Sequence, residues 1–304
     1  MLMREYLNFY IDGRWVPPTT PKTADVINPA TEQVSGRISL GSEADVEKAV
    51  QAAHKAFAGW SQTTRAQRLD LLSAIQSEYA KRQAEIGEAI TEEMGAPAAL
   101  GGGFHVGLGA GHIATAIEVL KTFKFEEKRG TTTLARDPIG VCALITPWNW
   151  PMNQIAVKVL PALATGNTMI LKPPQLAPYS AQLFTEVLHA AGVPAGVFNM
   201  IQGSGAVIGA ALSRHPLVDL VSITGSEAVG VEIAKNAAPT VKRVCQELGG
   251  KSAFIVLDDA GFAANVAGAT SGMMINSGQT CSAGSRLLVP KARMTEAIEI
   301  AAKA

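Results

Sequence analysis

Positions 139–145 read IGVCALI, an apolar run with the length and composition of a strand that is buried on both faces. A helix is expected at about 154–164 and a second apolar strand, NTMIL, at 167–171. Strands alternating with helices predict right-handed crossovers and a parallel, doubly wound, Rossmann-like α/β sheet. The alternation continues with helices expected at 180–190, 206–213 and 229–236, and with strands at 198–201, 220–223 and 241–247.

The chain before this region predicts short edge strands and then helices. Residues 5–40 alternate apolar residues with turn signals such as the Asp-Gly pair in IDGRW at 11–15. Ser42 is a predicted N-cap, and Asp45 occupies the capping-box position of the helix that follows. Two further amphipathic helices are expected at about 64–81 and 83–93.

Two segments between these helices and the sheet have unusual composition. GGG at 101–103 and GLGAG at 107–111 invite comparison with a nucleotide-binding loop, but no strand precedes them, so we interpret them as small residues at a close helix contact. Residues 118–138 contain FKF, the charged run EEKRG and TTTL, with the charged run expected as the turn of a polar β-hairpin. Because an isolated hairpin is marginally stable, we expect it to dock on a partner subunit.

Composition limits the class of protein. The 304 residues are 47% apolar and carry 26 Lys plus Arg against 26 Asp plus Glu, so no overall basic field is expected to bind nucleic acid or an anionic membrane. No apolar run reaches the length of a membrane-spanning helix, and the N-terminus lacks a signal-peptide pattern. The three cysteines show no metal-binding spacing, so no metal is expected, and a reducing, cytoplasmic location is favoured.

One cysteine stands out from the other two. Most lone cysteines in an apolar chain are inert and buried, and we expect this of Cys142 and Cys245. Cys281 lies in GQTCSAGSR at 278–286, where small residues leave its approach open. An accessible thiol is a candidate nucleophile when a base or a lowered pKa activates it.

Two further groups complete a possible acyl-transfer site. Glu247 ends an expected strand, where a surface carboxylate is common, but it is also a candidate general base. Asn149 lies in PWNWP at 147–151, where asparagine is a frequent turn residue, but its amide could also donate to an oxyanion. The thiol, the carboxylate and the amide suit covalent acyl transfer if the fold brings them together.

Other polar and glycine residues follow the ends of expected strands. Lys172 and Gln175 follow one strand, and a lysine there is normally solvated unless a ligand binds at the edge of the sheet. Gly225 and Ser226 follow another strand and precede a helix, whose N-terminus could bind a phosphate. Each signal is weak by itself.

In combination, these motifs resemble the NAD(P)-dependent aldehyde dehydrogenase family over the chain from about Leu7 onwards. The motifs, in order, are PWNWP at 147–151, PALATGN at 161–167, KPP at 172–174, ITGS at 223–226, ELGGK at 247–251 and GQTC at 278–281.

The resemblance implies a role for each matching residue. Cys281 is the implied nucleophile, Glu247 the base that activates the hydrolytic water, Asn149 part of the oxyanion hole, and Lys158 a proton relay. The implied cofactor is NAD or NADP and the implied substrate is an aldehyde. The implied cofactor-binding residues are Ile145, Thr146, Pro147, Trp148, Lys172, Gln175, Gly205, Gly225, Ser226, Val229 and Leu248.

The resemblance also suggests what distinguishes this chain. Gln175 stands where NAD-preferring members usually have a glutamate, which predicts tolerance of NADP. The chain ends at Ala304, whereas the family continues, so we expect a truncated catalytic domain with uncovered apolar surface at 266–275. Trp150, Met152 and Asn153 are expected to line the substrate path.

These inferences predict a cofactor domain formed by residues 1–117 and 140–246, an oligomerisation hairpin at 118–139, and the first part of a catalytic domain at 247–304. The expected assembly is a homo-oligomer, either a dimer or a tetramer. The expected reaction is oxidation of an aldehyde to a carboxylic acid. The alternatives are a truncated nucleotide-binding or structural homologue, and an enzyme that forms acyl-coenzyme A, which the presence of Glu247 disfavours.

Overall fold

The computed structural model describes residues 3–304, so Met1 and Leu2, the first residues of the expected cofactor domain, lie outside the described part. Within it the chain forms two compact units, one ending at Glu247 and the other spanning Leu248–Ala304. Each unit has its own secondary structure and its own apolar core.

The strands are β1 (Arg4–Tyr6), β2 (Phe9–Ile11), β3 (Arg14–Val16), β4 (Thr23–Asn28), β5 (Gln33–Ser39), β6 (Glu126–Arg129), β7 (Thr132–Ala135), β8 (Val141–Ile145), β9 (Thr168–Lys172), β10 (Phe198–Met200), β11 (Leu220–Gly225), β12 (Arg243–Leu248), β13 (Ala253–Ile255) and β14 (Arg286–Leu288). The α-helices are α1 (Glu43–Trp60), α2 (Arg65–Met94), α3 (Val106–Thr122), α4 (Pro151–Ala164), α5 (Tyr179–Ala190), α6 (Ala210–Arg214), α7 (Glu227–Ala237), α8 (Phe262–Met274) and α9 (Met294–Lys303). Short π-helical segments are Leu100–His105 and Gly205–Gly209, and short 3₁₀ segments are Ala238–Thr240, Ile275–Gly278 and Lys291–Arg293.

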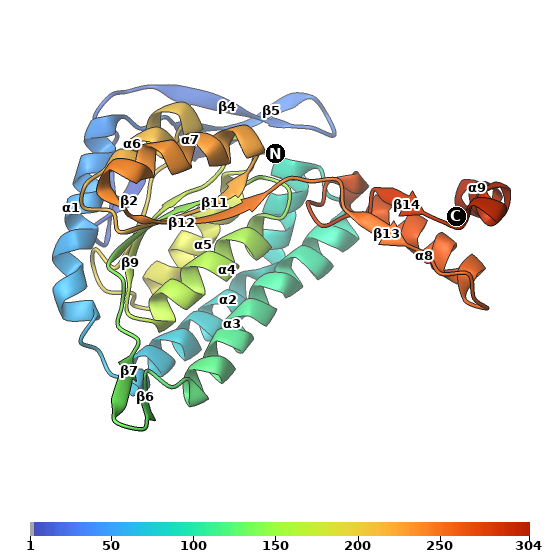
Figure 1. The fold of residues 1–304 in the computed structure, drawn as a ribbon. Coiled ribbons are helices and arrows are strands. Elements are labelled where there is room, and N and C mark those ends of the chain that lie inside the picture. The colour runs from blue at the N-terminus through green and yellow to red at the C-terminus, as the bar shows by residue number, and fades with distance from the viewer. Residues whose placement is uncertain (1–2) are drawn as a thin grey trace. The chain divides into compact units, whose positions relative to one another are not determined.

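The largest sheet within residues 3–304 has seven strands in the order β12-β11-β8-β9-β10-β2-β3 (Figure 1). The strands β11, β8, β9 and β10 pair in parallel. This confirms the predicted doubly wound α/β fold. An antiparallel hairpin, β2 and β3, extends the sheet beyond β10.

The order of the strands creates a switch point beside β8. The chain runs outward from β8 to β9 and β10 and then returns to place β11 against the other side of β8. The loops that leave β8 and β11 therefore diverge to opposite faces of the sheet. Doubly wound sheets bind ligands in the crevice outside the carboxyl ends of the strands at such a point.

Both faces of the sheet are covered by helices (Figure 1). Cys142 and Leu144 of β8 point into a core shared with α2, α3, α4 and α5. Val141, Ala143 and Ile145 point into a second core with α1, α6 and α7. The alternation follows from the two-residue period of a strand, and a strand buried on both sides must be apolar throughout.

Helix α2 corrects one sequence expectation. Its thirty residues run without interruption through position 82, where we expected a break between two helices. Arg82 is a good helix former, and its guanidinium pairs with Glu85 of the same helix and with Glu186 of α5. The N-cap is Thr64, whose hydroxyl accepts a hydrogen bond from the Gln67 N–H, and the C-cap is Gly95 in the left-handed conformation.

The hairpin also differs from its prediction. The charged residues of 126–129 form strand β6 itself rather than the turn, and residues 118–122 belong to α3. Glu127 pairs with Arg129 on its own strand and with Arg136 beyond the partner strand, so the charges are neutralised along the ribbon. The turn falls at Gly130, which has a φ of 62°.

The glycine-rich stretch at 101–111 packs against α2, as the sequence predicted. A Cβ atom on Gly87 of α2 would lie 2.6 Å from the Cα of Gly102, so neither helix could come this close with a larger residue at position 87.

The second unit contains a parallel pair of strands, β13 and β14, with helices α8 and α9. Its core is small and consists of Val256, Phe262, Val266 and Ala297. Arg293 covers the ring of Phe262 at 3.6 Å from the centroid, while its guanidinium pairs with Asp258 and Glu296. The expectation of uncovered apolar surface at 266–275 holds only at its end within this unit: Met274 and Ile275 are exposed, whereas Val266 and Ala269 are buried, Val266 because it faces the core.

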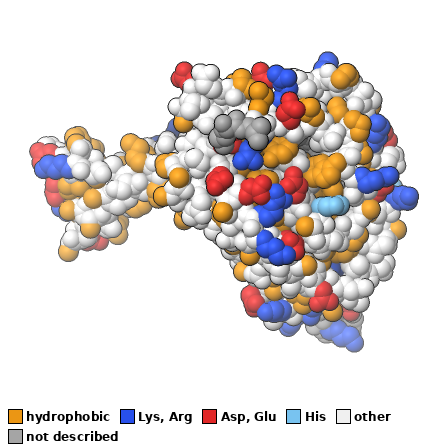
Figure 2. Space-filling view, turned by 180° about the vertical axis from the view of Figure 1, so that it is seen from behind, with side chains coloured by type: hydrophobic (Ala, Val, Ile, Leu, Met, Phe, Trp, Pro, Cys, Tyr) orange, Lys and Arg blue, Asp and Glu red, His pale blue; other side chains and the backbone are white. Residues whose placement is uncertain are grey.

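The surface carries mixed charge. On the face shown in Figure 2, acidic and basic side chains are interspersed over the larger unit. Among residues 3–304, no group of three or more His, Cys, Asp and Glu side chains is arranged to hold a metal ion.

None of the helices within residues 3–304 combines the length and the apolar character that crossing a membrane requires.

Candidate active site

Several of the predicted cofactor residues lie at the carboxyl ends of three neighbouring strands, β11, β8 and β9. Ile145 ends β8 and is in register with Lys172, which ends β9. Ile145 is also in register with Ile223 of β11, so Gly225 lies just beyond it on the other side. The backbone N–H of Thr146 donates to the carbonyl oxygen of Lys172 at 3.2 Å, which joins the two strand ends.

Two threonine hydroxyls are buried at this edge. Thr146 follows β8 and Thr224 lies near the end of β11, and both side chains are buried. Neither hydroxyl oxygen has a hydrogen-bond partner within residues 3–304. A buried hydroxyl without a partner is costly, so these two groups suit a polar ligand that binds at the switch point.

Lys172 is the third polar group of the edge. Its side chain is 5% exposed, and burial lowers the pKa of its ammonium group to about 8. Loss of contact with water disfavours the charged ammonium form of Lys172. A ligand that brings a hydrogen-bond acceptor, such as a hydroxyl or an anion, would stabilise that form.

Helix termini lie beyond two of the strands. Ser226 is the N-cap of α7, and its hydroxyl accepts a hydrogen bond from the Val229 N–H at 3.4 Å. Gly205 follows Ser204, which caps a π-helical turn in the same way through the Val207 N–H, rather than the simple helix we expected at 206–213. The positive end of the α7 dipole favours an anionic group near Ser226.

Lys158 and Glu247 line one groove of about 340 Å³, formed by residues of β8, α4, β11 and β12. The Lys158 ammonium donates to the Ser222 hydroxyl at 2.8 Å. Burial lowers the pKa of Lys158, and the nearby Cys245 and Glu247 oppose that shift. The groove therefore places an amine with a lowered pKa beside a carboxylate.

Cys245 corrects a further expectation. It is exposed and lines the same groove, whereas we expected an inert buried thiol. Cys142 is buried as predicted, and burial raises the pKa of its thiol to about 12.

Asn149 is held by the turn between β8 and α4. Pro151 begins α4, and Trp150 stacks on His105 with the ring centroids 4.5 Å apart. These contacts fix the turn on either side of the half-buried Asn149.

Cys281 belongs to the second unit and is exposed there. Three successive residues before it, Asn276, Ser277 and Gly278, have φ values of 57°, 56° and 74°. Such left-handed backbone is unfavourable for ordinary residues and turns the chain sharply before the cysteine. Asn149, Lys158 and Glu247 belong to the first unit, so the meeting of all four groups is part of the proposal below.

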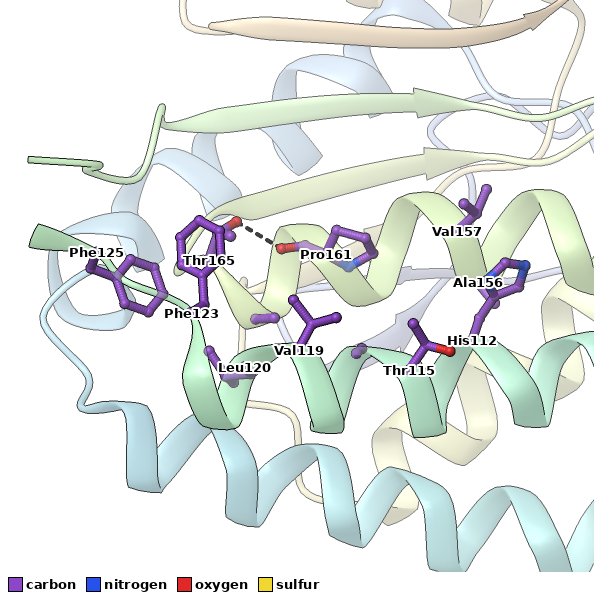
Figure 3. A pocket seen from close by; sticks show the side chains of 12 residues that line it. His112, Thr115, Val119, Leu120, Phe123, Phe125, Ala156, Val157, Pro161 and Thr165 are labelled. Atoms are coloured by element: carbon purple, nitrogen blue, oxygen red, sulfur yellow. Dashed lines mark hydrogen bonds between the residues drawn. The ribbon is translucent and has the colours of Figure 1, made fainter. Parts of the chain in front are cut away.

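A separate, almost entirely apolar groove of about 320 Å³ lies between α3 and α4 beside Phe123 and Phe125 (Figure 3). Val157, Pro161 and Thr165 line both this groove and that of Lys158. At one end of the apolar groove, His112 Nε2 lies 2.8 Å from Asn153 Oδ1.

Sequence reasoning missed this groove because its walls come from two helices that are distant in sequence. It also placed Met152 on the substrate path, whereas that side chain is fully buried in the core. Ser222 and Thr224 were missed too, although two polar residues in alternate positions of an apolar strand are a usable signal for one face of the sheet.

The sequence model of the aldehyde dehydrogenase family matches residues 15–304. The chain therefore belongs to the aldehyde dehydrogenase family.

Curated relatives support this assignment. The chain is 52% identical over 300 residues to a 3-succinoylsemialdehyde-pyridine dehydrogenase of a Pseudomonas species, covering 98% of this chain and 63% of that protein. It is 45% identical over 289 residues to a putative aldehyde dehydrogenase of Staphylococcus aureus, covering 95% of this chain and 61% of the relative.

Solved structures agree. A mutant of aldehyde dehydrogenase C from Pseudomonas syringae, in complex with NAD+ and octanal, is 48% identical with a TM-score of 0.95, covering 97% of this chain and 61% of that one. A betaine aldehyde dehydrogenase mutant from Staphylococcus aureus in complex with NAD+ is 32% identical with a TM-score of 0.93, covering 98% of this chain and 61% of that one. The present chain thus spans about three fifths of the length of these relatives.

Proposed function

We propose that this chain carries the cofactor site and the catalytic cysteine of an enzyme that oxidises an aldehyde to a carboxylic acid with NAD(P)+. The main support is the gathering of Thr146, Lys172 and Ser226 at the switch point of the sheet, in a chain of this family. Two relatives of known structure were solved with NAD+.

The cofactor would lie along the carboxyl edge of the sheet. Lys172 and Gln175 would contact the adenosine ribose, and Gly225, Ser226 and Val229 would approach the pyrophosphate at the start of α7. Ile145, Thr146, Pro147 and Trp148 would line the β8 side, with Gly205 and Leu248 at the margins. The two buried threonine hydroxyls fit such a ligand because they make no hydrogen bond within residues 3–304. Lys172 fits it because its buried ammonium group would gain an acceptor.

The chemistry of the chain's own residues would proceed in two stages. The Cys281 thiolate attacks the aldehyde carbon, and the Asn149 amide with the Cys281 N–H stabilises the oxyanion of the thiohemiacetal. When bound, NAD(P)+ would supply the acceptor for the hydride that the thiohemiacetal carbon loses, and the product on Cys281 would be a thioester. Glu247 then takes a proton from a water molecule that attacks the thioester, releasing the acid and the thiol.

Lys158 would serve as a proton relay for Glu247. Both side chains line the same groove, and burial lowers the pKa of the lysine. An amine with a lowered pKa exchanges protons more readily near neutral pH.

The aldehyde dehydrogenase C mutant of Pseudomonas syringae was solved with octanal, so aliphatic aldehydes are the first substrates to test.

We also propose an organisation around this site. Residues 1–117 and 140–246 would form the cofactor domain, 247–304 the first part of the catalytic domain, and the hairpin at 118–139 a contact between subunits of a homo-oligomer. The exposed, polar β6–β7 ribbon supports the last assignment. The three free cysteines favour a cytoplasmic location.

The direct test is aldehyde-dependent NAD(P)H production by the purified chain. We expect turnover of aliphatic aldehydes and its loss in Cys281→Ala, because the nucleophile is removed. Ser285→Ala, at an exposed residue of the same loop to which no catalytic role is assigned, is the control and is expected to retain activity. A folded chain that binds nucleotide but shows no turnover would favour the alternative of a non-catalytic, nucleotide-binding homologue.

Gln175→Glu tests cofactor choice. A carboxylate at this position would repel the 2′-phosphate of NADP+ and accept a hydrogen bond from the 2′-hydroxyl of NAD+, so we expect about tenfold weaker NADP+ binding with NAD+ binding retained. Calorimetric titration with each cofactor measures this. Gln62→Glu adds the same charge at an exposed turn, and an equal effect in both variants would contradict the assignment of Gln175.

A further inference from the structure

Helix α5 begins directly after the loop that carries two proposed cofactor residues. Residues 173–178 read PPQLAP and connect Lys172, at the end of β9, to Tyr179, the first residue of α5. The N-cap position is Pro178, which provides no side-chain hydrogen bond to the helix. The first N–H groups of a helix have no partner within the helix, so the segment 173–180 lacks its own means of satisfying them.

A distant carboxylate performs that capping. Glu93, near the end of α2, accepts hydrogen bonds from the backbone N–H groups of Tyr179 and Ser180, the latter at 3.2 Å. The Glu93 side chain is 3% exposed. A carboxylate at a helix N-terminus is stabilised by the backbone dipole as well as by the hydrogen bonds. Helix α5 is thus capped from another helix, across the core.

The neighbouring carboxylate has a different contact. Glu92 is also buried, but it accepts a hydrogen bond from Arg4 of β1 at 2.7 Å. Of these two adjacent glutamates, Glu93 accepts hydrogen bonds from the backbone of α5, whereas Glu92 is linked to that helix through Arg4, which lies over the Tyr179 ring at 5.5 Å from its centroid.

The loop between Lys172 and α5 is held at both ends. The carbonyl oxygen of Lys172 accepts from the Thr146 N–H, and the Pro178 carbonyl oxygen accepts from the Gln202 amide at 3.4 Å. Glu93 adds two bonds where the helix begins. The three prolines of the loop offer no N–H groups, so hydrogen bonds at its two ends help to hold the segment that carries Gln175.

We propose that Glu93 is a positioning residue for the proposed cofactor site: by capping α5 it sets the loop that presents Lys172 and Gln175 to the adenosine ribose. The inference rests on the proposed function, because it assigns the ribose to this loop. Glu93 acts through the start of α5, where it accepts hydrogen bonds from the N–H groups of Tyr179 and Ser180.

The test compares Glu93→Gln with Glu92→Gln in the full 304-residue chain. Equilibrium NAD+ binding is measured by calorimetry, and hydrogen exchange by mass spectrometry follows a peptide covering 172–182. At pH 8, above the pKa of about 7 that burial gives Glu93, we expect Glu93→Gln to bind NAD+ about tenfold more weakly and to exchange faster in that peptide, because an amide is a weaker acceptor than a carboxylate for the α5 N–H groups. Glu92→Gln is expected to leave both readouts at the wild-type level.

A folded Glu93→Gln variant with unchanged NAD+ affinity would overturn the proposal. If that variant does not fold, Glu93→Asp, which keeps the carboxyl group on a shorter side chain, is measured instead. Wild-type NAD+ affinity and wild-type hydrogen exchange in Glu93→Asp would also overturn the proposal. Absence of NAD+ binding by the wild-type chain would instead count against the proposed function. Faster exchange of the peptide in Glu93→Gln would then still show that Glu93 holds the start of α5.

Discussion

Val241 has a backbone conformation that its β-branched side chain disfavours. Val241 has a φ of 54° and a ψ of 25°, a left-handed conformation that β-branched residues rarely adopt, and its side chain is 90% exposed. It follows the 3₁₀ segment Ala238–Thr240 and turns the chain into β12. Since the side chain contributes little packing there, the strain has no evident compensation.

Val241→Asn is therefore expected to stabilise the first unit. Asparagine tolerates the left-handed region, and relief of the strain should raise the free energy of unfolding by about 1 kcal/mol. Urea denaturation measures the change. Val231→Asn, at an exposed valine inside α7, is the control and should give no gain; equal stability of Val241→Asn and the wild type would contradict this account.

The cysteines show what sequence can predict at this scale. The apolar neighbours of Cys142 predicted its burial, and the small residues around Cys281 predicted an open approach; the structure confirms both within their own units. Cys245 was wrongly predicted, because burial of a strand residue depends on where its strand stands in the sheet. Strand β12 is at one edge of the order, and several of its residues are exposed.

Among the elements, α2 combines two functions that its periodicity does not reveal. Its apolar residues pack in the core, and its last turn carries the buried Glu93. Burial raises the pKa of Glu93 to about 7, although the hydrogen bonds from Tyr179 and Ser180 and the charge of Arg4 act in the opposite direction.

This shift predicts a pH dependence of stability. The folded protein holds the Glu93 proton up to about pH 7, whereas an unperturbed glutamate releases it near 4.5. The folded state binds more protons between these values, so the contribution of Glu93 to the free energy of unfolding falls by about 3 kcal/mol as the pH rises through that range.

Urea denaturation at pH 5 and pH 8 checks this, with Glu93→Gln as the non-titrating reference. The stability of the wild type relative to the variant should fall at the higher pH. A relative stability that rises with pH would show that the carboxylate form is the better stabilised one.

Element boundaries were predicted less well than element types. The sequence of 126–129 resembles a turn in composition, but pairing of Glu127 with Arg129 and Arg136 lets it form a strand. Pairing between segments is a tertiary effect, which residue preferences alone do not contain.

For the whole molecule, alternation of strands and helices predicted the doubly wound sheet but not the order of its strands. The switch point follows from the return of β11 to the far side of β8, and neither strand's sequence specifies that neighbour. The sequence did not predict the antiparallel pairing of β2 with β10 either, since a single pair of residues in register, Met200 with Tyr10, joins the two strands. Ordered motifs suggested the residues of the proposed cofactor edge, while their convergence could be seen only in the fold.

The central claim is that this edge binds a dinucleotide, and calorimetric titration of the purified chain with NAD+ tests it most directly. We expect saturable binding that Lys172→Met weakens about tenfold, because a buried ammonium donor to the ribose is lost, while Lys124→Met at an exposed position near the hairpin has no effect. A folded chain that does not bind NAD+, or a Lys172→Met variant that binds it as tightly as the wild type, would contradict the account.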